Sequence, residues 1–385
     1  MKVIIIGAGI GGLTAAVALL RQGIEVEVFE AAPEWRDTGT GLGLASNATK
    51  VLHALDVDLS AGSSLEHFSI RTTTGKQLRE LPIGAVTREL GSPVVNIHRN
   101  DLIATLRKSA ADTPIHLGAQ LRSYSATGTG VSAIFEDGRT AHGELLIGAD
   151  GIGSQVRAQL AGHAPVTEHG YVCWLATVPF RDPRLPPGHA YHYWGRGLRF
   201  GLLDIGGGQA YWWGTRNLPT ALAREWNGGK AEIAAAFAGW APEVGEVIER
   251  TPEDAIVSVP AQDRPFLDVW GDGPVTLLGD AAHPMLTSLS QGGSSSVEDG
   301  FVLAHHLSTE SDPVGALRNY ENARRDRTRM LVTESRRLSK LEQIENPLVV
   351  RIRDAAVRAA PLAVLRRQNS APMRFELPVE RPVGP

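Results

Sequence analysis

The amino-acid sequence predicts a mixed α/β (α+β) protein, and three stretches carry this prediction. The chain opens with an apolar run, a glycine-rich turn, a helix-like segment and a second strand, which is the pattern of a parallel βαβ unit. Between residues 170 and 213, large aromatic side chains alternate with small or polar ones, which indicates an antiparallel sheet. Residues 317–343 have the pattern of a long amphipathic helix. We therefore expect a Rossmann-like parallel-sheet domain with an inserted antiparallel sheet and a long C-terminal helix.

The opening unit follows a strand, turn, helix and strand order. Residues 2–6 predict a buried strand, residues 13–22 a helix that Gly23 ends, and residues 25–29 a second strand. A membrane anchor is the alternative, because residues 3–20 carry no charged side chain. That alternative leaves the regular glycine spacing and the second strand unexplained, so we expect no membrane span.

The glycines of the turn have separate predicted tasks. Gly7 permits the tight turn, Gly9 lets a pyrophosphate approach the backbone, and Gly12 lets helix and strand pack closely. The free N–H groups at the helix start would face the phosphates. Glu30 lies 18 positions after Gly12, where a carboxylate can accept hydrogen bonds from an adenosine ribose. The unit therefore predicts a dinucleotide site lined by Gly7, Gly9, Ile10, Gly11, Gly12 and Glu30.

Composition is ordinary for a globular protein of this length. The chain has 385 residues, of which 43% are hydrophobic and 21% charged. Its net charge of -4 gives no electrostatic reason to expect nucleic acid as a partner, and we interpret the arginines of residues 324–337 as a solvated helix face. Cys173 is the only cysteine, which excludes an intrachain disulfide and fits a cytoplasmic protein. The histidines lack metal-ligand spacing, so no metal site is expected.

The remaining segments divide into four expected regions. Between the opening unit and the aromatic stretch, the sequence predicts a glycine-rich loop at 38–44, helices at 47–55 and from about 97–106, and strands at 115–117, 131–135 and 145–150. Later segments predict a buried strand at 275–279 and a helix at 294–307. We expect a discontinuous nucleotide-binding domain (1–165 and 265–310), a substrate domain (166–264, with parts of 65–100), a helical region (311–365) and a tail (366–385).

Two further stretches place an aspartate at the C-terminal end of a predicted parallel strand. Asp150 begins the Asp-Gly pair that follows the strand at 145–150, and Asp280 follows the strand at 275–279. Ligands of open α/β sheets bind at this edge. Either aspartate could instead cap the start of a helix, because Asp is a preferred N-cap residue.

Taken together, in this order and spacing, the three glycine- and aspartate-bearing stretches resemble the single-component flavin monooxygenases of the aromatic hydroxylase, or para-hydroxybenzoate hydroxylase-like, type. The resemblance extends from Met1 to about Arg337. It implies non-covalent FAD, with the adenosine ribose on Glu30. It further implies contacts of Arg99 with the diphosphate and ribityl region, of Asp280 with the ribityl chain, of Asp150 with FAD or the nicotinamide, and of Gly292 and Gly293 beside the flavin pyrimidine ring.

The resemblance also implies a reaction. NADH or NADPH would reduce FAD, O2 would form a flavin C4a-hydroperoxide, and one oxygen atom would hydroxylate or epoxidise a bound small molecule. The chain departs from the family pattern at Thr287 and Ser290, where relatives usually have Pro and Gly, and we expect this departure to alter the oxygen step. A flavin oxidase or dehydrogenase and a non-catalytic nucleotide- or lipid-binding carrier are the alternatives.

The substrate is expected between the flavin and the antiparallel sheet. Arg199 and Tyr211 resemble, in position, an Arg/Tyr pair that handles substrate in the urate-hydroxylase branch, and they are the candidate catalytic residues. A register slip of one residue would place them on opposite faces. Eight aromatic side chains fit a hydrophobic, aromatic or polycyclic substrate, although each alone is more often sheet core: Trp174, Tyr191, Tyr193, Trp194, Phe200, Tyr211, Trp212 and Trp213. We interpret His283 as a structural hydrogen-bonding residue.

Overall fold

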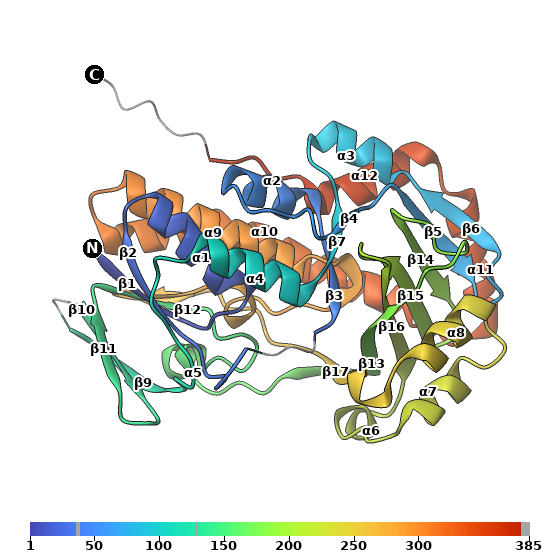
Figure 1. The fold of residues 1–385 in the computed structure, drawn as a ribbon, viewed down its shortest axis with the longest axis horizontal. Coiled ribbons are helices and arrows are strands. Elements are labelled where there is room, and N and C mark those ends of the chain that lie inside the picture. The colour runs from blue at the N-terminus through green and yellow to red at the C-terminus, as the bar shows by residue number, and fades with distance from the viewer. Residues whose placement is uncertain (36–38, 128–129, 379–385) are drawn as a thin grey trace.

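The protein consists of a parallel-sheet part and an antiparallel-sheet part that lie side by side along one long helix (Figure 1). The computed structural model describes residues 1–35, 39–127 and 130–378. The α/β fold class expected from the sequence is confirmed. The domain boundaries stay a prediction.

The parallel-sheet part is built on a six-stranded sheet. Its strands, in spatial order, are β18 (Gly271–Asp272), β19 (Val275–Leu277), β12 (Leu145–Gly148), β1 (Lys2–Ile6), β2 (Glu25–Phe29) and β8 (Ile115–His116). All neighbours pair in parallel except β18 and β19. Ile6 pairs with both Phe29 and Gly148, so the carboxyl ends of these strands align and bring distant loops to one edge.

Helices and a small antiparallel sheet cover this part. They are α1 (Ile10–Arg21), α2 (Ser46–Ala54), α4 (Arg99–Ser109), α5 (Gln155–Ala161) and α9 (Gly292–Thr309), with strands β9 (Leu121–Thr127), β10 (Gly130–Phe135) and β11 (Thr140–Gly143). α1 and α9 pack closely because Gly300 has no side chain: a β-carbon there would lie 2.7 Å from the Ala15 nitrogen. This contact holds the starts of both helices near the same strand edge.

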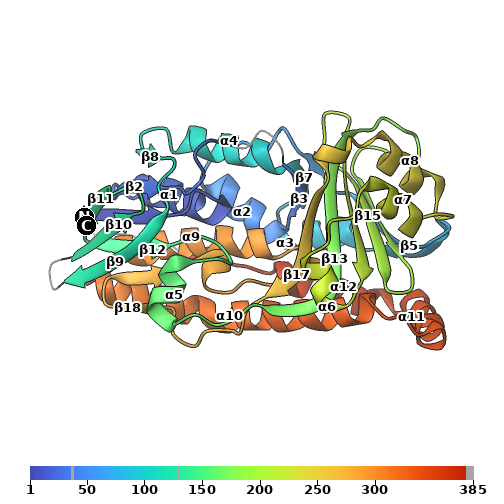
Figure 2. The same cartoon turned by 90° about the horizontal axis from the view of Figure 1, so that it is seen from below.

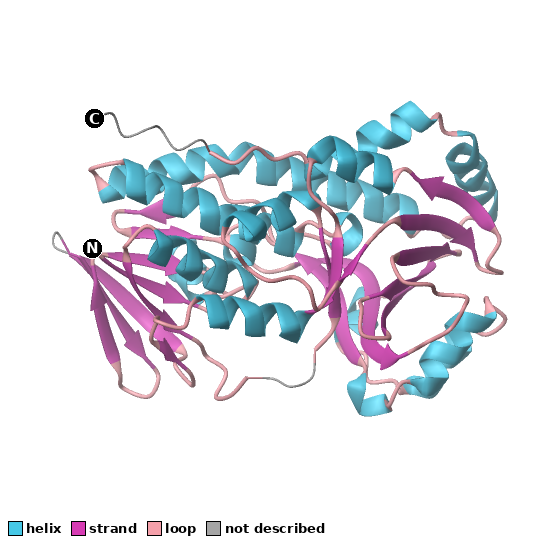
Figure 3. Ribbon diagram, turned by 45° about the horizontal axis from the view of Figure 1, so that its top comes forward, coloured by secondary structure: helices cyan, strands magenta, loops and turns pink. Residues whose placement is uncertain are grey.

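The second part is a seven-stranded sheet with helices on one face (Figure 3). Its strands, in spatial order, are β17 (Val257–Asp263), β13 (Thr167–Pro179), β16 (Gln209–Asn217), β15 (Leu198–Asp204), β14 (His189–Trp194), β5 (His67–Thr72) and β6 (Gln77–Leu81). Residues 205–208 form the hairpin turn that joins β15 to β16. The helices of this part are α6 (Thr220–Arg224), α7 (Lys230–Ala236) and α8 (Pro242–Arg250), and η1 (Glu253–Ala255) is a short 3-10 turn.

A fourth sheet, of three strands, lies between the two parts, where the sequence predicted only a glycine-rich loop at 38–44. Thr38 lies outside the described residues, but Gly41–Leu44 form β3, which pairs with β7 (Val95–His98); β4 (Ser63–Ser64) is the third strand. The loop prediction was therefore wrong for these residues. Their glycines serve packing, since a β-carbon on Gly41 would lie 2.3 Å from the Tyr211 ring.

The C-terminal helices connect the two parts. α10 (Pro313–Glu342) runs past both of them in Figure 2, and α11 (Pro347–Ala359) and α12 (Leu362–Met373) follow. α12 packs against α3 (Ile83–Leu90) and Leu365 lies in a small apolar core, so the expected tail is helical up to Met373. Residues 379–385 of that tail lie outside the described residues. Within the described ranges, no helix combines the length and apolarity needed to cross a bilayer.

Candidate active site

The glycine turn after β1 leaves open space at one position. Gly7 has a φ of +107°, and a β-carbon there would lie 2.3 Å from the Ala149 carbonyl oxygen. A β-carbon on Gly12 would lie 2.0 Å from the Gly7 oxygen, so both residues are required by the packing of the protein itself. A β-carbon on Gly9 would meet nothing within 4 Å, and the φ of Gly9 is an ordinary -74°. No contact among the described residues requires glycine at position 9, which leaves room for a bound group against the backbone.

Glu30 is held against this turn by the backbone. Its carboxylate oxygens accept hydrogen bonds from the Ala8 N–H at 2.8 Å and from the Ala32 N–H at 2.9 Å. Each carboxylate oxygen can accept a second hydrogen bond. The Glu30 side chain is therefore fixed in orientation while it retains acceptor capacity for a hydroxyl group.

Asp280 lies in the 3-10 turn η2 (Gly279–Ala281), directly after β19. Burial raises the pKa of its carboxyl, while the charges of His283 and Arg99 act to lower it. The residue nevertheless keeps solvent-accessible surface, so its carboxylate can be reached by a ligand. In the part of the chain that the structure describes, no residue hydrogen-bonds to this carboxylate. Arg99, exposed at the start of α4, lies near enough to share its electrostatic field.

Two helix N-termini meet beside Asp280. Neither α1, which starts after Gly9, nor α9, which starts after Gln291, has a side-chain cap. A β-carbon on Gly292 would lie 3.8 Å from an Asp280 oxygen, and one on Gly293 would lie 3.7 Å from the Ile10 side chain. Uncapped N–H groups at a helix start favour anions. The starts of α1 and α9 and the Asp280 carboxylate, which come from distant parts of the sequence, thus lie close together at one strand edge with anion-binding character.

Asp150 differs from Asp280. Its carboxylate accepts hydrogen bonds from the Gln155 N–H at 2.8 Å and the Val156 N–H at 3.3 Å, at the start of α5. The helix-cap alternative raised for both aspartates therefore describes Asp150. The other Asp150 oxygen is buried without a hydrogen-bond partner among the described residues. Asp280 makes no such cap, which leaves it available to a ligand.

The register of the β15–β16 hairpin places Arg199 and Tyr211 on one face. Leu203 pairs with Tyr211 and Arg199 pairs with Thr215, and directly paired residues share a face. This face is directed at the first part of the protein, because the Tyr211 ring lies over Gly41 of β3 and Arg199 reaches Ser288 at 3.5 Å. The hairpin register, which the sequence left open, is thereby decided.

Most of the eight aromatic side chains expected near the substrate lie on the opposite face of the sheet from Arg199 and Tyr211. Trp174, Tyr191, Tyr193, Phe200 and Trp212 form a core with α7 and α8, and Trp194 packs in the core beside α12. The prediction that these side chains offer a surface to substrate was wrong. Alternation along the strands turns the first five toward the covering helices, whereas Trp194 pairs with Arg199 and shares its face but is buried in the core that contains Leu365. Tyr211 and the partly exposed Trp213 remain on the face that is directed at the first part.

The charge of Arg199 is balanced by Glu342, a residue that no sequence pattern indicated as part of the site. Arg199 is buried and forms an ion pair with Glu342, the last residue of α10, which is buried as well. Its Nε also lies 3.3 Å from the Thr215 hydroxyl. His192, on the same face of the neighbouring strand, has its pKa lowered to about 3 by burial and by the Arg199 charge, so it is uncharged at neutral pH. The sheet face around Arg199 therefore carries little net charge.

Comparisons with known proteins agree with this geometry. Residues 1–335 match the family described as "FAD binding domain". The chain is 35% identical to the aurachin C monooxygenase/isomerase of Stigmatella aurantiaca over 361 residues, which are 93% of this chain and 94% of that protein. It is 32% identical to the FAD-dependent urate hydroxylase of Klebsiella pneumoniae over 343 residues, 88% of this chain and 89% of that protein.

The structure of Klebsiella pneumoniae HpxO complexed with FAD and uric acid superposes with a TM-score of 0.89 at 29% identity and covers 97% of this chain and 96% of that one. This chain belongs to the FAD-dependent monooxygenases of the aromatic hydroxylase family. FAD is the cofactor of this flavin monooxygenase, and NADH or NADPH is the typical electron donor of its family. The expected family, enzyme class and cofactor are confirmed.

A buried ionic network joins the loop after Asp280 to α9 and α10. Arg324 of α10 lies 2.6 Å from carboxylate oxygens of both Glu298 and Asp299, and His283 lies 2.6 Å from Asp299. Glu298 also accepts a hydrogen bond from Asn47. The expected structural role of His283 agrees with this geometry. The solvated-face interpretation was wrong for Arg324, because the acids that it pairs with lie on α9, about 25 residues away, and their pairing pulls it inward.

The loop between Asp280 and α9 contains the two departures from the family pattern. Thr287 begins the 3-10 turn η3 (Thr287–Leu289), and Ser290 has a φ of +52°. A left-handed backbone is favourable for glycine, which explains why glycine is usual at this position in the family. Leu286 is tied to α10 through its carbonyl oxygen and the Ser335 hydroxyl. The effect of both departures on the oxygen step stays a prediction.

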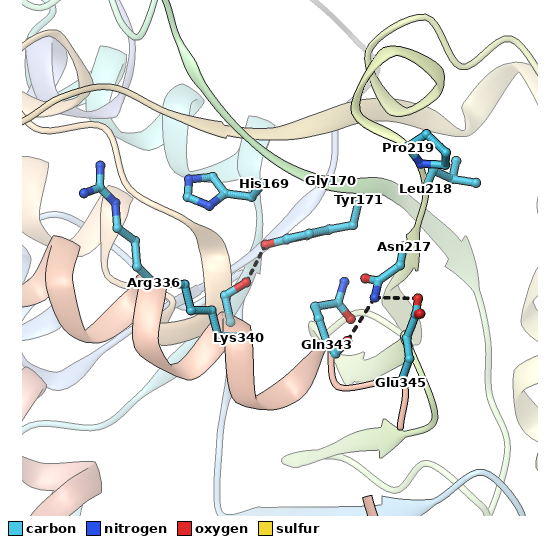
Figure 4. A pocket seen from close by; sticks show the side chains of 11 residues that line it. His169, Gly170, Tyr171, Asn217, Leu218, Pro219, Arg336, Lys340, Gln343 and Glu345 are labelled. Atoms are coloured by element: carbon cyan, nitrogen blue, oxygen red, sulfur yellow. Dashed lines mark hydrogen bonds between the residues drawn. The ribbon is translucent and has the colours of Figure 1, made fainter. Parts of the chain in front are cut away.

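An open polar cavity of about 570 Å³ lies between the antiparallel sheet and the C-terminal part of α10 (Figure 4). It is lined by the start of β13, the end of β16 and the C-terminal part of α10. Several polar groups that line it hydrogen-bond to one another. Tyr171 and Ser339 share a hydrogen bond of 3.0 Å, and the Asn217 amide donates to the Gln343 carbonyl and to Glu345, each at 2.9 Å. The cavity lies on the Arg199 side of the sheet, since the Arg199 guanidinium is 5.9 Å from the Tyr171 ring. Neither the glycine turn after β1 nor Asp150 or Asp280 lines it, so we assign the chemistry to the strand edge and not to this cavity.

Proposed function

We propose that this enzyme transfers one oxygen atom from O2 to an uncharged, hydrophobic aromatic or polycyclic small molecule that binds between the flavin and the sheet face of Arg199 and Tyr211. The observation that carries the proposal is the neutralised Arg199. A buried guanidinium that already pairs with Glu342 gains little from a second anion. A carboxylate substrate would also bring like charges together in a region of low dielectric.

The relatives support the small aromatic class of substrate. Klebsiella pneumoniae HpxO was crystallised with uric acid, and one relative is named aurachin C monooxygenase/isomerase. The partly exposed Trp213 offers a flat apolar surface on the proposed substrate side. An uncharged ring system fits both features.

We further propose how the chain holds FAD. Glu30 accepts hydrogen bonds from the adenosine ribose, the uncapped start of α1 with Gly9 faces the diphosphate, and Asp280 and Arg99 contact the ribityl and diphosphate region. The uncapped start of α9 stabilises negative charge beside the flavin ring. When bound, FAD supplies electron transfer from NAD(P)H and activation of O2. The protein positions the reactants and excludes water.

The lone, buried Cys173 and the net charge of -4 support a cytoplasmic enzyme that does not bind nucleic acid. A flavin oxidase or dehydrogenase with the same cofactor site is the competing function. A monooxygenase transfers one oxygen atom of O2 to its substrate, whereas an oxidase or dehydrogenase transfers none.

The test of the proposed function is oxygen incorporation. Uncharged aromatic compounds are screened for stimulation of NADH or NADPH oxidation, and hits are turned over under isotopically labelled O2. We expect product with a mass gain of one labelled oxygen atom. Turnover with hydrogen peroxide release and no label in any product would assign the enzyme to the oxidase class.

Glu342→Gln is expected to change the preference of the site for charge. The substitution keeps the shape of the side chain but leaves Arg199 without its counter-charge. The affinity for an anionic ligand should therefore rise relative to the affinity for an uncharged one. We expect the ratio of dissociation constants for 2-naphthoate and 2-naphthol to shift by about tenfold or more toward 2-naphthoate. The constants are read from perturbation of the flavin spectrum.

Glu345→Gln is the matched control, because Glu345 lies three residues further along the chain and is exposed. It should leave the ratio unchanged. Equal ratios in wild type, Glu342→Gln and the control would show that Glu342 does not set the charge preference.

A further inference from the structure

α11 lies at one end of the molecule (Figures 1 and 2), and it carries, together with the start of α12, several exposed apolar side chains. Leu348 and Ile352 of α11 are 64% and 68% exposed, and Leu362 of α12 is 60% exposed. Val349 and Val364 are 42% and 45% exposed. We call these five residues the apolar end patch.

Most of the patch lies on the solvent-facing side of α11, and the opposite side of this helix packs against the rest of the protein. Leu348 and Ile352 are four residues apart and share one side of α11, which continues through the exposed Ala355 and Ala359. On the opposite side, Arg353 is buried and Val357 packs against the small core with Leu365. A surface helix normally turns polar residues outward. An apolar outward face on a helix that is docked by its other face indicates an external partner.

The charge around the patch is positive, although Arg353 pairs with Asp354, and Arg366 and Arg374 pair with Glu89. Residues 347–374 contain six arginines and one aspartate, in a chain whose net charge is -4. Arg351, Arg358 and Arg367 are exposed, and no carboxylate in the described part of the chain lies within salt-bridge distance of them. The partner that complements this surface is therefore apolar and anionic together.

α11 is also held against the end of β14 and the end of α10 through one buried arginine. The Arg353 guanidinium lies over the Trp194 ring at 5.0 Å and donates to the Gly195 carbonyl at 3.3 Å and to the Glu342 carbonyl at 3.4 Å. Glu342 is the residue that neutralises Arg199. The patch thus lies on a helix that contacts both Trp194 and Glu342.

We propose that the apolar end patch docks the enzyme on the surface of an anionic lipid bilayer. Its leucine, isoleucine and valine side chains enter the boundary between headgroups and acyl chains, and Arg351, Arg358 and Arg367 contact the lipid phosphates. A second copy of the chain fits less well, because a two-fold contact through the same patch would bring the arginines of both copies together. The proposal is independent of the proposed function, since docking requires no turnover.

The test is flotation of the FAD-loaded full-length chain with vesicles. We expect binding to vesicles of phosphatidylcholine with phosphatidylglycerol, and about tenfold weaker binding to phosphatidylcholine alone. The triple variant Leu348→Ser/Ile352→Ser/Leu362→Ser should lose about tenfold or more in binding to the anionic vesicles. The triple variant Arg351→Gln/Arg358→Gln/Arg367→Gln should lose binding and its salt dependence.

Val269→Ser is the matched control, because Val269 is 64% exposed and lies outside the patch. It should bind as wild type does, and flavin absorbance and the thermal midpoint confirm that each variant is folded. Absence of binding to anionic vesicles, or equal loss in the control, would overturn the proposal. A wild-type dimer by light scattering that the apolar variant dissociates would assign the patch to a second copy of the chain and overturn the lipid assignment. Oxygen incorporation is measured separately, so either proposal can fail alone.

Discussion

Asp280→Ala is expected to weaken FAD binding by about ten- to a hundredfold. The Asp280 carboxylate has no hydrogen-bond partner among the described residues and the residue keeps accessible surface, so a ligand is its expected partner. A hydrogen bond to a charged group contributes about 1.5–3 kcal/mol, and each 1.4 kcal/mol is about tenfold in affinity. Affinity is measured by titrating the apoprotein with FAD and following flavin fluorescence.

The stability of the apoprotein separates a binding role from a structural one. Asp280→Ala should leave the thermal midpoint of the apoprotein near the wild-type value. Asp150→Ala is the contrasting variant, because the Asp150 carboxylate caps α5 and its loss should cost about 0.5–2 kcal/mol of stability. Wild-type FAD affinity in Asp280→Ala would show that the cofactor site is assigned to the wrong aspartate.

Arg324→Met is expected to lower the free energy of unfolding by about 3–5 kcal/mol. The substitution removes the cation that two buried carboxylates share, those of Glu298 and Asp299, and leaves their charges in the interior. Thermal or urea unfolding of the purified protein measures the loss. Arg329→Ala on the same helix is the matched control, because its ion pair with Asp268 is exposed and such pairs contribute about 0–1 kcal/mol. Similar losses in both variants would contradict a special role for the buried network.

The same network predicts an acid-sensitive fold. Burial by itself would raise the pKa of Asp299, but the charges of His283 and Arg324 outweigh it and lower the pKa to about 2. The stability that this ionised carboxylate contributes is present above its ordinary pKa of about 3.9 and is lost as the pH falls from about 4 to about 2. Because Arg324→Met removes one of the two cations, its acid unfolding, followed by circular dichroism, should occur at higher pH than that of the wild type.

The sequence by itself determined the local units and the cofactor class. The strand, glycine turn and helix at residues 2–21 follow from apolar runs and glycine spacing, which are properties of neighbouring residues. The same holds for β10, expected at 131–135 and observed at Gly130–Phe135, and for α10, whose expected range of 317–343 lies close to the observed Pro313–Glu342. Glu30 could be placed from its distance to Gly12, because the βαβ unit fixes that separation in space.

Only the tertiary structure decided which side chains face the substrate side and which charges are buried. Alternation along a strand does not say which face is covered, so the aromatic residues of β13 to β16 could not be assigned until α7 and α8 were in place. Arg199 and Glu342 are 143 positions apart, and no local pattern predicts that they pair. The same is true of Arg324 with Asp299 and of Asn47 with Glu298. Buried charges find their partners through the packing of whole elements, and this information is not contained in the spacing of neighbouring residues.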